Sequence, residues 1–64
     1  MPEYGALLRM ARKRAGLTQA DCIGMFGLKS RRELIALEHG TIPMTKAFYD
    51  DALDKIERAR TVAA

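Results

Sequence analysis

Two adjacent arginines, Arg31 and Arg32, are the side chains in this sequence best suited to specific recognition chemistry. They follow Ser30, a residue type that commonly caps the start of a helix. Positive charge at that end of a helix opposes the helix dipole and costs roughly a few tenths of a kcal/mol per residue, which suggests a gain elsewhere. Arginine can donate two hydrogen bonds to O6 and N7 of guanine, worth about 1–3 kcal/mol of discrimination per pair. The alternative is a solvated basic face.

The charge of the chain is unevenly distributed along its length. The 64 residues carry a formal net charge of +3, but residues 1–32 hold seven basic and two acidic side chains, a net charge of +5. The remaining residues have a net charge of −2. Such a concentration of positive charge in a small protein is typical of a polyanion-binding surface.

Other kinds of chemistry have little support in the sequence. Cys22 and His39 could in principle form a thiolate–imidazole pair, but Cys22 occupies an apolar helix position and no third orienting group is evident. We therefore expect a core cysteine, no enzymatic activity, no small-molecule substrate, no cofactor and no metal site. The chain has no apolar run of the roughly 20 residues that a membrane span needs and no signal-peptide pattern, which predicts a cytoplasmic protein without membrane contact.

Helical periodicity and capping patterns predict an all-α fold in a single domain, residues 1–64. An apolar stripe predicts a first helix from Tyr4 to Ala15, which Gly16 ends. Capping boxes, Thr18 with Asp21 and Ser30 with Glu33, start the second and third helices. The second ends at Gly27 and the third at His39 and Gly40, while Thr45 caps a fourth that reaches about residue 60. We expect a frayed tail over residues 61–64.

Two short capped helices joined by a glycine-containing turn are the ingredients of a helix-turn-helix. The residues Gly16-Leu17-Thr18-Gln19, then Gly27, then Leu37-Glu38-His39-Gly40 and Pro43 complete a recognisable pattern. In its G-L-T-Q opening, its turn glycine and its L-E-x-G close before a proline, the chain resembles the phage-repressor/Cro (XRE-like) family over roughly residues 4–45. The resemblance implies a compact lambda-repressor-like domain of four, or alternatively five, helices that binds DNA.

The resemblance also implies roles for individual residues. Base contacts fall to Arg31, Arg32 and Ala36 on the third helix. Gln19 resembles the family's backbone-contacting glutamine, with a solvent-facing glutamine as the alternative, and Lys29 and Ser30 are further candidates for phosphate contact. Glu38 needs a partner because it lies at the carboxyl end of its helix, and the resemblance assigns Arg12 to it as a structural ion pair.

The sequence departs from the family pattern in two places. It has one residue more than the usual spacing between Gly27 and Glu38, which we place at Lys29, and Ile23 replaces a small alanine between the two helices. Either change could shift the third helix by about one position. In that case Glu33 or Ile35 would lie nearer to DNA.

The last predicted helix has one apolar face, which could be buried within the monomer or shared with a second subunit. We expect the second, with Phe48, Tyr49, Leu53 and Ile56 at a homodimer interface. The sequence therefore predicts a small phage or mobile-element regulator, similar to an anti-CRISPR-associated repressor or a restriction-modification controller, that binds an inverted-repeat operator in its own promoter as a dimer. The alternatives are an antitoxin or a protein-interaction module that uses the C-terminal amphipathic helix.

Overall fold

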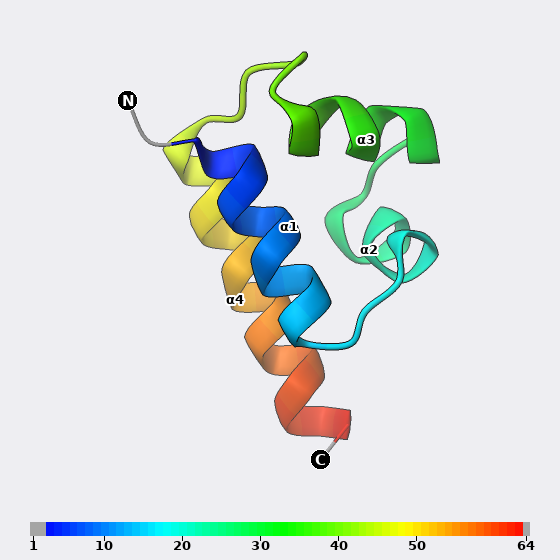
Figure 1. The fold of residues 1–64 in the computed structure, drawn as a ribbon. Coiled ribbons are helices and arrows are strands. Elements are labelled where there is room, and N and C mark those ends of the chain that lie inside the picture. Colours follow the sequence, from blue (N-terminus) through cyan, green and yellow to red (C-terminus); the bar gives the residue numbers. More distant parts are fainter. Residues whose placement is uncertain (1–2, 64) are drawn as a thin grey trace.

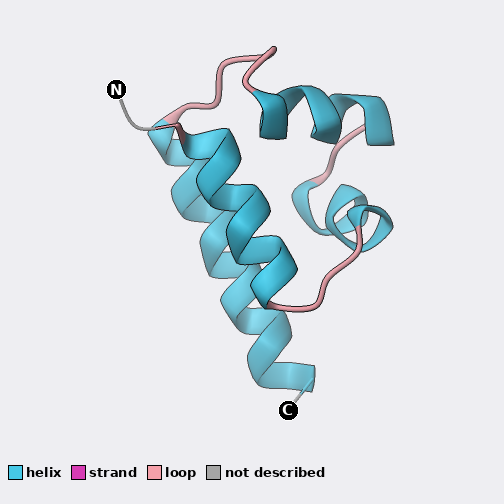
Figure 2. Ribbon diagram, in the orientation of Figure 1, coloured by secondary structure: helices cyan, strands magenta, loops and turns pink. Residues whose placement is uncertain are grey.

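The chain folds into four helices joined by short loops (Figure 2). The computed structural model describes residues 3–63, with side chains up to residue 60. The helices are α1 (Tyr4–Arg14), α2 (Gln19–Phe26), α3 (Arg31–His39) and α4 (Lys46–Ala63), and these described residues contain no strand and no fifth helix. The all-helical prediction is confirmed. α4 continues through Ala63, Ala64 lies outside the described residues, and the fraying expected over residues 61–64 stays a prediction.

Side-chain caps account for where three of the helices begin. Thr18 and Asp21 form the predicted capping box of α2: the Thr18 hydroxyl accepts from the Asp21 N–H at 3.1 Å, and the Asp21 carboxylate accepts from the Thr18 N–H at 2.9 Å. Thr45 caps α4 by accepting a hydrogen bond from the Phe48 N–H at 3.1 Å. Ser30 caps α3. Each cap satisfies a backbone donor that has no partner within its helix.

The helices form two groups in space (Figure 1). α1 and α4 lie side by side and run in the same direction, and α2 and α3 lie together on one side of this pair. α1 contacts both α4 and α3, while α2 contacts α3 and α4. This arrangement supports the short α2–α3 unit on the two longer parallel helices.

The core lies where these two groups meet, and every helix contributes to it. Its buried members are Leu8 from α1, Cys22 and Phe26 from α2, Leu34 from α3, and Ala52 and Ile56 from α4. Burying a large aliphatic side chain stabilises the fold by about 1.5–3 kcal/mol, so this cluster holds α3 in a defined position. Cys22 is fully buried within it, which confirms the prediction of a core cysteine.

Candidate nucleic-acid interface

The turn between α2 and α3 is built around Gly27. This glycine ends α2 in the left-handed conformation (φ 68°), which a residue without a Cβ adopts at little cost. The Leu28 N–H then donates to the Ile23 carbonyl at 3.0 Å, so the chain reverses close to the end of α2. Ile23, the departure from the small residue of the family pattern, is half-buried and packs against the core.

The first turn of α3 differs from the predicted capping box. The Ser30 hydroxyl accepts from the Glu33 N–H at 3.4 Å, as expected. The Glu33 carboxylate, however, accepts from the N–H of Lys29 at 2.9 Å and not from that of Ser30. The prediction of a bond from the Ser30 N–H to Glu33 is therefore wrong, because the Glu33 carboxylate reaches one residue further back into the turn. This bond holds the Glu33 carboxylate at the turn and leaves the Lys29 side chain exposed.

The inner face of α3 is anchored in the protein, and its outer face carries the predicted base-contacting residues. Leu34 is fully buried, whereas Arg31 and Arg32 are exposed and Ala36 is half-exposed. At 100° per residue, Arg32 and Ala36 lie about 160° from Leu34 around the helix axis, and Arg31 lies only about 60° away. Arg32 and Ala36 therefore share the outward face, whereas Arg31, although exposed, lies on the flank of α3 nearer to Leu34.

His39 is an exposed residue on this same face that the sequence analysis did not assign. It follows Ala36 by three positions and Arg32 by seven, which is the spacing of residues stacked along one side of a helix. That spacing was visible in the sequence and could have identified it.

The predicted phosphate-contacting residues cluster at the amino ends of α2 and α3. Gln19 is the first residue of α2 and is half-buried, directly after the Thr18 cap. Ser30 and Lys29 are exposed before α3. Backbone N–H groups and the positive end of the dipole favour an anion at each helix start, although Asp21 and Glu33 already occupy part of these positions.

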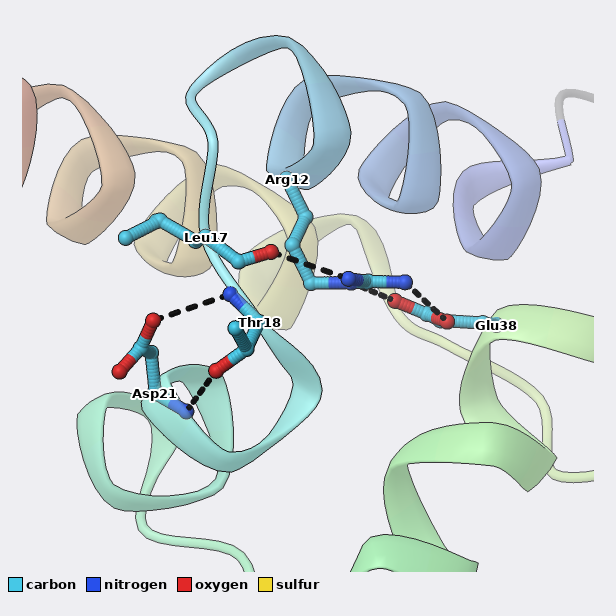
Figure 3. Close-up of polar contacts among 5 residues, drawn as sticks. All are labelled: Arg12, Leu17, Thr18, Asp21 and Glu38. Atoms are coloured by element: carbon cyan, nitrogen blue, oxygen red, sulfur yellow. Dashed lines mark hydrogen bonds and ion pairs between the residues drawn. The ribbon is translucent and has the colours of Figure 1, made fainter.

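Arg12 and Glu38, the predicted structural pair, form a two-point contact between α1 and α3 (Figure 3). The Arg12 Nε donates to one carboxylate oxygen of Glu38 at 2.7 Å, and a terminal guanidinium nitrogen donates to the other at 3.3 Å. The remaining guanidinium nitrogen donates to the Leu17 carbonyl at 3.1 Å, just before α2. Arg12 is only 6% exposed, so it joins three segments of the fold and is not a surface cation.

A second contact between α1 and α3, at Gly5, was missed by the sequence analysis. A Cβ built at Gly5 would lie 2.8 Å from the Glu38 carbonyl oxygen and closer still to that of Leu37. Only glycine allows the two backbones to approach this closely. The available signal was a glycine inside a predicted helix, where it normally destabilises by about 0.5–1 kcal/mol relative to alanine.

The bases of α4 and the exposed bases of the first half of the chain differ in whether ion pairs neutralise their charge. The bases of α4 with described side chains each pair with an acid of the same helix, in the pairs Lys46–Asp50, Lys55–Asp51, Arg58–Asp54 and Arg60–Glu57. Within the described residues, six exposed bases of the first half take part in no ion pair. They are Arg9, Lys13, Arg14, Lys29, Arg31 and Arg32.

The proposed dimer residues of α4 pack mainly inside the monomer. Ile56 is 2% exposed and belongs to the core, so its assignment to an interface is wrong. Phe48 lies edge-on to Phe26 with ring centroids 6.1 Å apart, and Tyr49 packs on Tyr4 at 4.9 Å. Their aromatic faces therefore stabilise the monomer. Leu53 remains half-exposed on the side of α4 that faces α1.

Neither a metal-binding cluster nor a membrane span is found in the described part of the chain. No group of three or more His, Cys, Asp or Glu side chains in it could hold a metal ion, and none of its helices has the length and hydrophobicity needed to cross a bilayer. No protein-family model, no curated protein and no solved structure matches the chain.

Proposed function

We propose that the protein is a sequence-specific DNA-binding transcriptional regulator, with α2 and α3 as a helix-turn-helix. One observation carries the proposal: α3 is anchored through Leu34 and Glu38 while its opposite face presents Arg32 and Ala36. A recognition helix needs this combination of a buried inner face and exposed side chains that can reach base edges.

The unpaired bases supply the nonspecific part of the affinity. Lys29, Arg31 and Arg32 are exposed at the turn and the start of α3, while Arg9 and Lys13 add charge along α1. Phosphate contacts of this kind position a protein on the duplex, and base contacts then provide sequence preference. Gln19 and Ser30 are the proposed neutral partners of the phosphates.

The proposed regulator binds an inverted repeat in its own promoter as a homodimer and represses transcription there. A single helix of nine residues contacts few base pairs, and two copies on half-sites about 34 Å apart double those contacts. The roles of antitoxin or interaction module gain no support from α4, because most of its apolar face covers the protein's own core.

The test is binding to the DNA upstream of the protein's own gene, compared with unrelated DNA of equal length in a gel shift. We expect preferential binding to the upstream DNA, and log K should fall linearly with log salt, by about 0.9 per phosphate contacted. The double variant Arg31→Ala/Arg32→Ala should lose the preference. Its control is Lys55→Ala/Arg58→Ala, which removes the same charge from α4 and should retain it. Equal binding of both DNAs by the wild-type protein would refute the proposal.

A further inference from the structure

A shallow groove of about 270 Å³ runs along the seam between α1 and α4. Leu7, Met10 and Ala11 line one side of the groove, with Tyr49 and Leu53 on the other. Charged side chains, Arg14, Glu57 and Arg60, lie at one end of it. The groove therefore has an apolar floor and a polar end.

Two large apolar side chains of α1 are left uncovered at this groove. Leu7 is 42% exposed and Met10 is 57% exposed, whereas Leu8 on the core side of the same helix is fully buried. Met10 is thus not the packing residue that its type suggests. Neighbouring exposed apolar side chains next to a groove are the feature that marks a protein-interaction surface.

The residues along this edge of α1 are arranged so that the edge complements itself. Glu3, the residue before α1, and the groove residues Leu7, Met10 and Arg14 are spaced by four, three and four residues, the pattern of a seam between two packed helices. Two copies of α1 that pack antiparallel, with the two-fold axis between residues 8 and 9, bring Leu7 against Met10 of the second copy. The same symmetry brings Glu3 against Arg14 of the second copy.

The charges favour the antiparallel orientation and a second copy of this chain as the partner. Glu3 and Arg14 are both exposed, and neither takes part in an ion pair among the described side chains. In the antiparallel arrangement each acid faces a base at both ends of the seam, whereas a parallel arrangement would place like charges together. A two-fold interface requires this kind of self-complementary patch.

We propose that the protein forms a homodimer through the α1–α4 groove, with Leu7, Met10 and Leu53 at its centre and Glu3–Arg14 pairs at its ends. This interface would give the proposed regulator a specific dimer surface. Its biological role rests on the proposed function, but the dimer itself does not, because self-association is measured without DNA. None of the residues that line the groove belongs to α2 or α3, which lie together beside the α1–α4 pair (Figure 1). The proposed α1–α4 interface replaces the expected interface centred on the aromatic residues of α4.

The test is sedimentation equilibrium of the full chain over a wide concentration range. We expect a wild-type dimer and a folded monomer for Met10→Glu, since Met10 is exposed and its replacement leaves the core intact. Ala20→Glu introduces the same charge at an exposed position of α2 and should remain dimeric. A wild-type monomer at every concentration, or a dimeric Met10→Glu, would overturn the proposal.

A charge exchange tests the orientation. Glu3→Arg should weaken the dimer by placing two bases together, and the double variant Glu3→Arg/Arg14→Glu should restore it. Failure of the double variant to recover would exclude the antiparallel pairing. A wild-type monomer that still binds a single half-site would refute this interface and leave the proposed function intact. A wild-type dimer without any preference for the upstream DNA would support the interface and refute the proposed function.

Discussion

Replacing Gly5 by alanine tests whether the close approach of α1 and α3 is required for the fold. The new Cβ would lie 2.8 Å from the carbonyl oxygen and 3.0 Å from the carbonyl carbon of Glu38, and nearer still to the Leu37 oxygen. These neighbours are backbone atoms at the end of α3, so no side-chain rotation can relieve the overlap. One of the two helices must move, and the buried contact of Arg12 with Glu38 moves with it.

The size of the effect follows from comparison with a second helical glycine. A Cβ at Gly24 in α2 would meet no atom within 4 Å, so Gly24→Ala should stabilise the protein by about 0.5–1 kcal/mol through helix propensity alone. Overpacking a tight contact costs about 1–3 kcal/mol, which should outweigh the same gain at Gly5. We therefore expect the two alanine variants to differ by about 1–3 kcal/mol.

Thermal unfolding followed by circular dichroism measures this difference. For a domain of this size 1 kcal/mol corresponds to about 4–8 °C in Tm, so Gly5→Ala should melt about 5–20 °C below Gly24→Ala. Equal melting temperatures for the two variants would refute the packing of α1 against the end of α3.

Three further predictions concern buried or capping groups. Arg12→Met and Glu38→Leu should each destabilise by about 3–5 kcal/mol in urea unfolding, because one charge stays buried alone, and the double variant should recover most of this loss; single variants within about 1 kcal/mol of wild type would contradict the role of the pair. Burial raises the pKa of Cys22 from 9.0 to about 11, so the folded state should lose stability as the pH rises between these values. At pH 8, Ellman's reagent should react about 100-fold more slowly with the native than with the unfolded thiol, and a fast native reaction would be inconsistent with burial. The hydrogen bond from the Thr18 N–H lowers the pKa of Asp21, so the Asp21 carboxylate stabilises the fold above pH 3.8 and this stabilisation is lost as the pH falls further. Asp21→Asn should flatten this part of a pH-stability curve, and an unchanged curve would contradict the cap.

The sequence was sufficient to predict the helices because their signals are local. Thr18, Asp21 and Thr45 form caps whose partners lie three residues away, and Gly16, Gly27 and Gly40 adopt the positive φ expected at helix ends. The pairing of Arg12 with Glu38 spans 26 residues, and it was suggested by a family resemblance and not by local spacing.

The remaining features depend on how the helices pack, which periodicity alone does not specify. The apolar face of α4 was visible in the sequence, but its burial by the protein's own helices was not, so Ile56 was assigned to an interface instead of the core. The exposure of Leu7 and Met10 also depends on helix packing, because the other helices cover fewer of the apolar side chains of α1 than the sequence suggests. Glu33 accepts from the Lys29 N–H and not from that of Ser30, a detail that the S-x-x-E pattern does not contain.

The central claim is that α3 reads DNA sequence, and single substitutions that each remove one positive charge test it most directly. Arg31→Ala, Arg32→Ala and Lys13→Ala are compared for binding across an operator and its single-base variants. We expect Arg32→Ala, whose side chain lies on the outward face, to cost about 1–3 kcal/mol and to relax preference at one position per half-site. Lys13→Ala should weaken all variants equally. If both arginine substitutions also weaken every variant uniformly, α3 does not read the bases and the account is contradicted.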